Sequence, residues 1–214
     1  MRKKRVLCFG DSLTWGFNPI DATRFDEDTR WTGVLQKMLG EQYKIIEEGQ
    51  NGRTIVVDDF ESRDKSAAKY IWPCLESQNP LDLVVVMLGT NDLKIHLKLS
   101  AEDIAREMEE FISIVCEFNT QYVANFKIRL MAPPCVPGDM HDSRYGESFG
   151  YEYARERSVK FPELYRQIAD KYGIEFLDTN KYVEVGLVDS IHIEEDQEKL
   201  LAKAVADKVT ELIG

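Results

Sequence analysis

The sequence predicts an α/β fold, namely a flavodoxin-like three-layer sandwich with a five-stranded parallel sheet. The first reason is that short apolar runs alternate with longer segments of helical periodicity, a pattern typical of a parallel sheet with helices on both faces. The second is the continuous apolar run over residues 81–88, which fits a central strand covered on both sides. Because no linker divides the 214 residues, we expect a single domain over residues 1–214.

Five segments are predicted to be strands, and three of them end in residues that favour turns. They span residues 5–9, 43–47, 81–88, 127–131 and 174–177. The first ends at Gly10, the second in a glycine-rich turn over residues 48–53, and the fourth at Pro133 and Pro134. In an open parallel sheet the carboxyl ends of the strands face the ligand crevice. We therefore expect the functional residues in the segments that follow the strands.

Five further segments have the periodicity of helices. They span residues 30–39, 66–78, 100–118, 151–172 and 196–213. Gly40 is a suitable stop for the first, and Pro73 is expected to kink or divide the second. Ser100 is expected to cap the third, with Asp103 completing a near capping box. A bend near Pro162 is expected in the fourth.

The net charge of −11 and a sequence pI near 4.9 limit the partners that the protein can have. An acidic surface repels phosphate backbones and anionic lipid headgroups, so we expect neither a nucleic acid nor a membrane as a partner. No stretch is long enough to span a bilayer, and Gly10 and Asp11 interrupt the first apolar run too early for an export signal. The four cysteines lack Cys-x-x-Cys spacing and are expected to be reduced, which indicates a cytoplasmic protein. The assembly state stays open, a homo-oligomer included.

Residues suited to acyl transfer follow the predicted strands. They are Ser12, Gly52, Asn91, Asp189 and His192. Because the strand ends share one edge of the sheet, these residues can converge. A serine hydroxyl is a poor nucleophile at neutral pH, so we predict that His192 takes the proton of Ser12 and that Asp189 holds the other ring nitrogen. The oxyanion would accept hydrogen bonds from the backbone N–H groups of Ser12 and Gly52 and from the Asn91 amide.

Four blocks of the sequence resemble those of the GDSL, or SGNH, hydrolases. They are Gly10-Asp11-Ser12-Leu13, Gly52, Gly89-Thr90-Asn91-Asp92 and Asp189-x-x-His192, and they follow the family's order over almost the whole chain. Residues 8–16, 30–33 and 47–49 resemble the bacterial arylesterase and acyltransferase branch, some members of which also perform perhydrolysis. The resemblance implies the SGNH hydrolase fold with its five-stranded flavodoxin-like sheet. It also implies the roles given above and an enzyme without a metal or organic cofactor.

We therefore expect a serine esterase or acyltransferase that hydrolyses short-chain esters, aryl or small alkyl, through an acyl-enzyme. The expected partner is a small-molecule ester. Alternatives within the fold are a carbohydrate or small-metabolite O-deacetylase, a lysophospholipase and a thioesterase. A further alternative is a non-catalytic flavodoxin-like module that binds a nucleotide or flavin. Asp11 and the lack of a phosphate-binding pattern after the first strand argue against it.

The substrate pocket is expected to include Asp11, Trp15 and Pro134, which lie near the nucleophile or at a strand end on the same edge. Bulky groups there would leave little room for a long acyl tail, so acetyl to butyryl esters should be preferred. Phe17 follows the predicted nucleophile on the same loop. The sequence leaves three roles open for it, namely a core aromatic, part of the pocket wall, or a contact between subunits. Residues 136–151 do not match the arylesterase branch, so substrate preference cannot be carried over from it.

Other polar groups have simpler explanations. His141 lies near two aspartates in a loop, but no second ligand group has clear spacing, so we expect a solvated loop and no metal. His96 is expected at the surface or in the pocket wall, and Cys135 has no recognisable partner as a nucleophile. The acidic pair Asp58 and Asp59 is expected to be solvated surface.

Overall fold

A five-stranded parallel sheet forms the centre of the molecule, which the computed structural model describes over residues 2–214. Its strand order is β2-β1-β3-β4-β5, and each pair of neighbouring strands is parallel. The strands are β1 (Lys4–Gly10), β2 (Tyr43–Gly49), β3 (Leu83–Met87), β4 (Lys127–Ala132) and β5 (Glu175–Asp178). This is the flavodoxin-like order, so the predicted fold class is confirmed.

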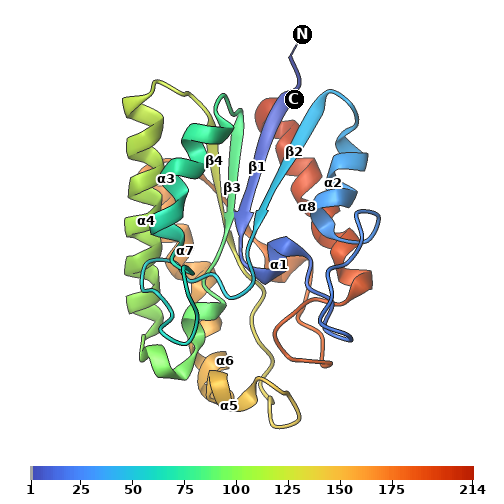
Figure 1. The fold of residues 1–214 in the computed structure, drawn as a ribbon, viewed down its shortest axis with the longest axis vertical. Helices are drawn as coiled ribbons and strands as arrows, with labels where there is room; N and C mark the ends of the chain where they lie inside the picture. The colour runs from blue at the N-terminus through green and yellow to red at the C-terminus, as the bar shows by residue number, and fades with distance from the viewer. Residues whose placement is uncertain (1) are drawn as a thin grey trace.

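Helices cover both faces of the sheet and produce a three-layer sandwich (Figure 1). One layer consists of α2 and α8, which pack against each other, and the other of α3, α4 and α7. The bounds of these long helices are α2 (Trp31–Leu39), α3 (Ala67–Gln78), α4 (Ala101–Gln121), α7 (Phe161–Tyr172) and α8 (Glu195–Ile213).

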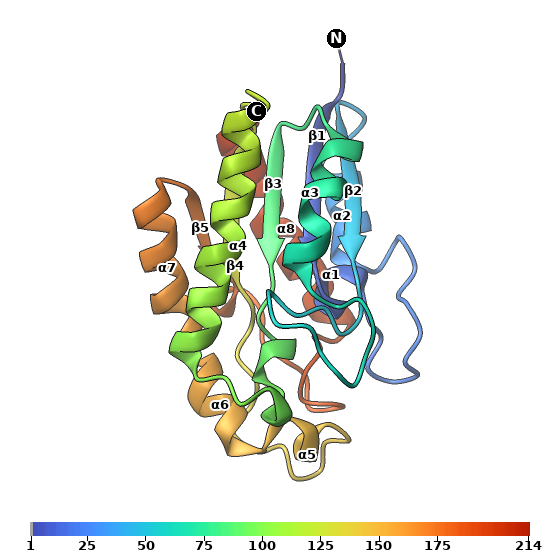
Figure 2. The ribbon, with the colours of Figure 1, turned by 60° about the vertical axis from the view of Figure 1, so that its left-hand side comes forward.

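Short helices lie beyond the carboxyl ends of the strands, as Figure 2 shows for α1, α5 and α6. They are α1 (Ser12–Trp15), α5 (Gly146–Phe149) and α6 (Glu152–Ser158), together with the 3-10 turns η1 (Asn91–Leu93), η2 (Ile95–Leu97) and η3 (Thr179–Lys181). The connections that carry the predicted functional residues therefore meet at one end of the molecule. None of the helices in residues 2–214 is both long and apolar enough to cross a membrane.

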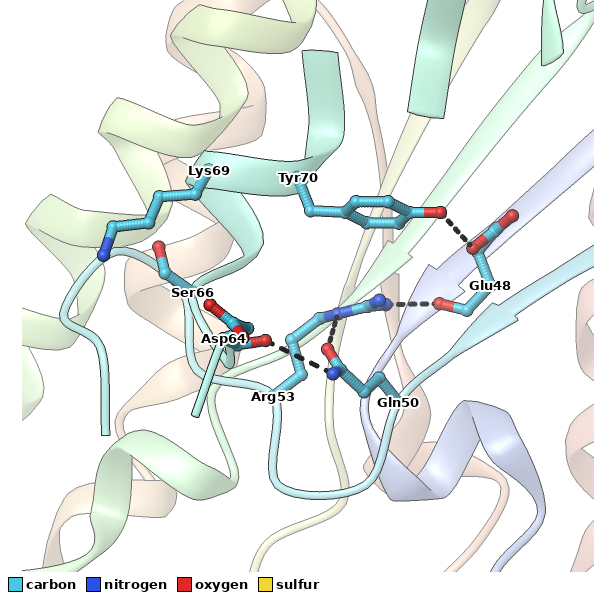
Figure 3. Close-up of a pocket in the computed structure, with 7 residues that line it drawn as sticks. All are labelled: Glu48, Gln50, Arg53, Asp64, Ser66, Lys69 and Tyr70. Carbon is cyan, nitrogen blue, oxygen red and sulfur yellow. Dashed lines mark hydrogen bonds between the residues drawn. The ribbon is translucent and has the colours of Figure 1, made fainter. Parts of the chain in front are cut away.

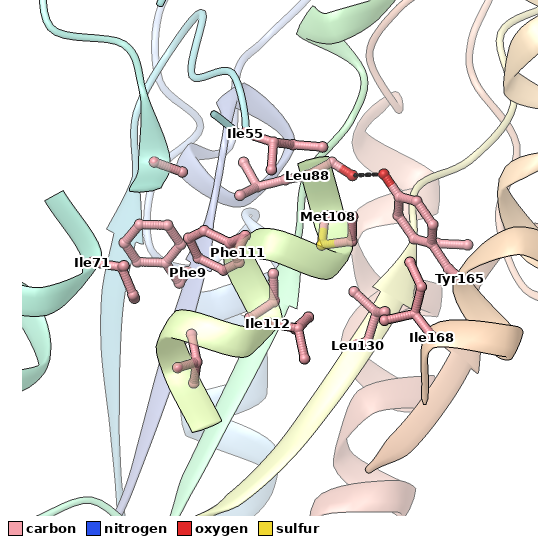
Figure 4. Close-up of a cluster of buried hydrophobic side chains, with 14 of the residues drawn as sticks. Phe9, Ile55, Ile71, Leu88, Met108, Phe111, Ile112, Leu130, Tyr165 and Ile168 are labelled. Carbon is pink, nitrogen blue, oxygen red and sulfur yellow. Dashed lines mark hydrogen bonds between the residues drawn. The ribbon is translucent and has the colours of Figure 1, made fainter. Parts of the chain in front are cut away.

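Side-chain alternation along β1 divides the core between the two faces of the sheet. Leu7 and Phe9 face the layer of α3, α4 and α7, whereas Val6 and Cys8 face α2 and α8. In the first cluster, Phe9 stacks on Phe111 with ring centroids 5.6 Å apart (Figure 4). All five residues of β3 are buried, as expected of a central strand with a continuous apolar run.

The helix ends largely follow the predicted signals. The capping box of α4 is present, since Ser100 Oγ accepts the Asp103 N–H at 3.0 Å and the Asp103 carboxylate accepts the Ser100 N–H at 2.9 Å. The bend near Pro162 is a complete break, because α6 ends at Ser158 and Pro162 lies in the first turn of α7. Of the kink or division expected at Pro73, the division is wrong, because α3 continues through it. Pro73 is exposed, so water can pair with the carbonyl group that loses its donor.

Two glycines at strand tips let α1 pack directly against the edge of the sheet. A Cβ atom at Gly10 would lie 2.1 Å from Thr14 Oγ1 and 2.6 Å from the Met87 carbonyl oxygen. A Cβ atom at Gly49 would lie 2.2 Å from the Trp15 backbone nitrogen. No side chain fits at these distances, so both tips require glycine.

A buried carboxyl group links the helices of the α2–α8 layer. Glu198 lies in the first turn of α8, and its Oε2 accepts the Trp31 N–H at 2.7 Å, which satisfies a free donor at the start of α2. Its Oε1 has no hydrogen-bond partner among residues 2–214. Burial raises the pKa of Glu198 to about 8, although the Trp31 N–H and the charge of Arg30 oppose the shift.

Replacing Glu198 by glutamine should stabilise the protein increasingly as the pH rises. The folded state binds the Glu198 proton more tightly than the unfolded state, so the wild-type protein loses stability between about pH 4.5 and pH 8. Glutamine keeps the acceptor for Trp31 without ionising, so we expect a gain of roughly 1–3 kcal/mol in the free energy of unfolding at alkaline pH. Urea denaturation at acidic, neutral and alkaline pH measures this, with the exposed Glu195→Gln as control. A gain that does not change with pH would contradict the assignment.

Candidate active site

Three side chains form a chain of hydrogen bonds at the carboxyl edge of the sheet. Ser12 begins α1 directly after β1, and its Oγ lies 2.8 Å from His192 Nε2. His192 Nδ1 lies 2.7 Å from Asp189 Oδ2. The exposed fractions of Ser12, His192 and Asp189 are 6%, 5% and 0%. The structure thus brings together the three residues that the sequence nominates as nucleophile, base and carboxylate.

The loop after β5 holds Asp189 in one orientation. Its Oδ1 accepts the N–H groups of Ile191 at 3.0 Å and His192 at 2.9 Å, which leaves Oδ2 for the imidazole. Ser190 has a φ of +62°, a conformation that is uncommon for a residue with a side chain. Burial by itself would raise the pKa of Asp189, but the hydrogen bond and charge of His192 and the two backbone donors lower it to about 2. Asp189 is therefore ionised at neutral pH.

Aromatic rings fix the plane of the His192 imidazole. Phe17 stacks on it with ring centroids 4.2 Å apart, and Tyr145 meets it edge-on at 6.2 Å. Tyr145 comes from the connection between β4 and α5, so a segment far away in the sequence contributes to the site. These contacts restrict rotation of the ring and keep its Nε2 directed at Ser12.

Three residues that the sequence predicts as hydrogen-bond donors to an oxyanion line one cavity. Asn91 Nδ2 is buried and finds no hydrogen-bond partner within residues 2–214. Gly52 has a φ of +78°, which glycine adopts without strain, and it turns the chain after β2. Ser12 is the first residue of α1, where backbone N–H groups lack a partner within the helix. The three residues line the same cavity.

This cavity has a volume of about 280 Å³ and includes Ser12 and His192 in its lining. Pockets for drug-sized ligands typically measure about 300–1,000 Å³, so the cavity suits a small substrate. Its wall combines apolar and polar side chains from several connections. The apolar ones are Phe17, Tyr145, Phe149 and Ile191, and the polar ones besides the residues named above are Asn51, Glu61, Lys94 and Ser148.

Asp11 and Pro134 do not line the cavity, contrary to expectation. Asp11 is 0% exposed, and its carboxylate accepts the Leu13 N–H at 2.9 Å, so it caps α1 instead of meeting a ligand. Burial raises the pKa of Asp11 to about 6, against the opposing effects of the Leu13 N–H and the charge of His192. Pro134 is buried beyond the end of β4.

Trp15 also lies outside the cavity lining, and Phe17 takes the place expected for it. The indole of Trp15 packs against Phe17 at 6.3 Å and under the Arg24 guanidinium at 5.5 Å. Phe17 reaches the cavity in place of Trp15 because α1 is short. Gly16, with a φ of +84°, ends the helix after one turn and reverses the chain, so the next residue reaches the imidazole.

Asp59 is buried, which corrects the prediction of a solvated acidic pair. Its exposed fraction is 1%, and its carboxylate oxygens contact Lys94 Nζ at 2.6 Å and His96 Nε2 at 2.9 Å. Because Lys94 and Glu61 line the cavity, Asp59 anchors part of its polar wall. The ligand atoms of Asp59, Glu61 and His96 lie within 4.8 Å of one another, as a metal site requires. Lys94 already supplies a positive charge there, so the arrangement fits an ion pair better than a metal ion.

Two other sequence candidates lie outside the cavity lining. His141 is exposed, and its Nε2 contacts Glu152 at 3.0 Å, whereas Asp139 accepts the backbone N–H of His141 and not its ring. The Cys135 thiol donates to the Ser158 carbonyl at 3.5 Å. Burial raises the pKa of Cys135, which disfavours the thiolate that a nucleophile needs.

A second cavity, of about 460 Å³, lies between the loop after β2 and the start of α3 (Figure 3). Arg53 lines it, donating to the Gly10 carbonyl at 2.7 Å and to Gln50 Oε1 at 3.2 Å, and it also bonds the Glu48 carbonyl. Arg53 therefore ties the end of β1 to the loop after β2. This contact fixes the neighbouring Gly52 relative to the end of β1.

A sequence model of the GDSL-like lipase/acylhydrolase family matches residues 8–198. The chain belongs to the GDSL-like lipase/acylhydrolase family. The matched region of this GDSL-like protein includes all the strands except the first residues of β1, and it includes Ser12, Asp189 and His192. None of the curated proteins compared with the sequence matches it.

Three solved esterase structures are similar to the GDSL-like protein over nearly its whole length. The aryl esterase of M. smegmatis is 34% identical with a TM-score of 0.89, covering 98% of this chain and 100% of that one. A carbohydrate acetylesterase from Sinorhizobium meliloti is 35% identical with a TM-score of 0.91, covering 99% and 100%. A putative arylesterase from Agrobacterium tumefaciens is 31% identical with a TM-score of 0.88, covering 98% and 100%. The predicted fold and enzyme class, a hydrolase of carboxylic esters, are thus confirmed.

Sequence patterns do not identify Arg144, Tyr145 and Phe149 as site residues of the GDSL-like hydrolase. They lie within residues 136–151, where the sequence offers no motif to assign, about 130 residues after the Gly-Asp-Ser turn. Only the aromatic content of this loop points to a pocket wall. The fold brings the segment to the cavity because it follows β4, whose carboxyl end lies on the same sheet edge as that of β1.

Proposed function

We propose that this hydrolase cleaves short-chain carboxylic esters, aryl or small alkyl, through an acyl-enzyme on Ser12. One observation carries the proposal: hydrogen bonds run from Asp189 through His192 to Ser12, at a small cavity that is also lined by Asn91, whose Nδ2 has no partner in residues 2–214. A carboxylate, an imidazole and a serine hydroxyl in this order are the groups that nucleophilic acyl transfer uses.

In the acylation half, Ser12 Oγ attacks the ester carbonyl carbon and its proton passes to His192 Nε2. The carbonyl oxygen becomes an oxyanion, which the N–H groups of Ser12 and Gly52 and the Asn91 amide stabilise. Asp189 is ionised and stabilises the imidazolium that forms. The intermediate then collapses, the carbon–oxygen bond to the alcohol breaks, and His192 gives its proton to the leaving alcohol.

In the deacylation half, water or another alcohol takes the place of the leaving group. His192 removes its proton as it attacks the acyl carbon of the ester on Ser12. Collapse of the second intermediate releases the acid, or a new ester, and the proton returns from His192 to Ser12 Oγ. Hydrolysis and acyl transfer thus differ only in the nucleophile of this half.

The size of the cavity supports a preference for short acyl groups. Tyr145, Phe149 and Ile191 line the 280 Å³ cavity, which leaves little space for a long tail. A second candidate is the removal of O-acetyl groups from carbohydrates. The polar side chains of Asn51, Glu61 and Lys94 favour it, since they offer hydrogen bonds to hydroxyl groups of a sugar. The similar protein from Sinorhizobium meliloti is a carbohydrate acetylesterase.

A series of esters with one aryl leaving group tests the proposal. We expect kcat/KM to be highest for acetate to butyrate and to fall for octanoate and palmitate. An open apolar channel would instead gain about 0.8 kcal/mol, or roughly fourfold, for each methylene that it buries. A rise that continues to octanoate would therefore contradict a short-chain enzyme. If an O-acetylated monosaccharide is hydrolysed with a higher kcat/KM than the aryl acetate, the carbohydrate candidate replaces the first.

Two aromatic variants locate the wall that limits chain length. Tyr145→Ala enlarges the cavity and should move the optimum to longer acyl chains. Trp15→Ala is the matched control, because Trp15 is an aromatic residue near Ser12 that lies outside the lining. The same optimum in wild type and Tyr145→Ala, or a shift in Trp15→Ala alone, would contradict this assignment of the wall.

A further inference from the structure

Arg144 reaches the predicted triad from a distant part of the sequence. It precedes α5, and its Nη2 lies 3.3 Å from Asp189 Oδ2, the oxygen that also bonds His192 Nδ1. The same nitrogen donates to the Pro19 carbonyl at 2.9 Å. Asp189 is fully buried, whereas 43% of the Arg144 side chain is exposed. A cation thus touches the outer side of the carboxylate that serves the imidazole.

Neighbouring groups give this guanidinium a fixed position. It lies 5.8 Å from the Phe17 ring and 5.2 Å from the Tyr145 ring, and both rings also contact the His192 imidazole. The preceding residue, Ser143, donates its hydroxyl to the Asp189 backbone carbonyl. Two consecutive residues therefore hold Asp189, one through its main chain and the other through its carboxylate.

We propose that Arg144 is a positioning residue that orients the Asp189 carboxylate and lowers the pH above which His192 acts as a base. The proposal rests on the function proposed above for the same site. Arg144 does not line the cavity, so it acts through Asp189 and not on the substrate.

The direction of the expected shift in the working pH of His192 follows from the neighbouring charges. A carboxylate that also faces a guanidinium is a weaker partner for an imidazolium, and the guanidinium itself repels the imidazolium charge. Removing Arg144 therefore favours the protonated imidazole, and the enzyme should need a higher pH to become active. The other charged groups near His192 are Asp11 from the turn after β1 and Glu61 and Lys94 from the cavity wall. They are the same in wild type and variant, so the difference between the two reports on Arg144.

NMR titration of the imidazole groups tests the proposal without requiring activity. The chain has three histidines, so the His192 signal can be assigned with His96→Gln and His141→Gln. In Arg144→Gln we expect the His192 titration midpoint to move up by roughly 0.5–1 pH unit, a modest shift because the guanidinium is partly exposed. Arg155→Gln is the matched control, because the side chain of this exposed arginine from α6 bonds only the Val136 carbonyl among residues 2–214.

Activity against the aryl acetate provides the second readout. The acid limb of the pH profile of kcat/KM should move by the same amount, which is about a three- to tenfold loss below the midpoint with little change in KM. Arg144→Lys keeps the charge and should recover part of the shift. Arg144→Met removes the charge but keeps a long side chain over the two rings, so it replaces the glutamine variant if that one unfolds.

The outcomes separate this inference from the proposed function. If Arg144→Gln and Arg144→Met lower activity equally at every pH and leave the His192 midpoint in place, Arg144 only packs and the inference is overturned. An equal shift in Arg155→Gln would also overturn it, because the effect would then be one of net charge. If the wild type hydrolyses no ester while the midpoint still shifts, the proposed function fails and the electrostatic role of Arg144 stands.

Discussion

Ser12→Ala is expected to abolish ester hydrolysis while the protein stays folded. The variant lacks the only atom placed to attack a carbonyl carbon with a base at 2.8 Å among the residues lining the cavity. Loss of a catalytic serine typically costs on the order of 10⁴–10⁶ in kcat. The measurements are kcat with an aryl acetate, the melting temperature, and covalent labelling by a fluorophosphonate, which should modify the wild type once and the variant not at all.

Ser148→Ala is the matched control for this experiment. Ser148 lines the same cavity, is exposed, and takes no part in the proposed chemistry. Its activity should stay within a few fold of wild type, which would separate loss of the nucleophile from a general effect of removing a hydroxyl group. Wild-type turnover by Ser12→Ala would show that another group attacks the ester.

Asp189→Asn should have the second largest effect, a loss of about 10⁴ in kcat. An asparagine Oδ1 can keep the two backbone hydrogen bonds of Ile191 and His192, so the loop should retain its shape. Its Nδ2 then faces His192 Nδ1 as a donor, which forces the proton onto Nε2 and removes the acceptor that Ser12 needs. KM for the aryl acetate should change little, because Asp189 does not line the cavity.

The exposed Asp142→Asn serves as the control for the loss of one negative charge. It should retain full activity. Comparable turnover by Asp189→Asn and Asp142→Asn would mean that the imidazole needs no carboxylate, and the base would have to be reassigned.

The sheet and the convergence of Ser12, His192 and Asp189 could be predicted because they depend on local signals and one topological rule. Gly10 ends β1, Ser12 starts the next helix, and Asp189 lies three residues before His192. Each of these local patterns can be recognised in the sequence. The alternation of strands and helices then predicts a parallel sheet whose carboxyl ends coincide. The strand order of the structure agrees with it.

The pocket could not be predicted in the same way, because side-chain direction depends on short irregular segments. Trp15 and Phe17 are only two positions apart in the sequence. The left-handed conformation of Gly16 between them decides which ring contacts His192. The burial of Asp59 depends on Lys94, which is 35 residues away and whose position follows only from the packed loops. Pairs of acidic residues are usually solvated, so the local sequence predicted the wrong exposure for Asp59.

Residues 143–149 have a consequence for how enzymes of this kind diversify. Ser143 and Arg144 contact Asp189, while Tyr145 and Phe149 line the cavity. A recombination event that exchanged this one segment between relatives would leave the sheet and Ser12 untouched. It would nevertheless transfer both the shape of the proposed acyl pocket and the surroundings of the proposed general base in one step. Natural variation in substrate range and in working pH should therefore be inherited together at this position in the chain.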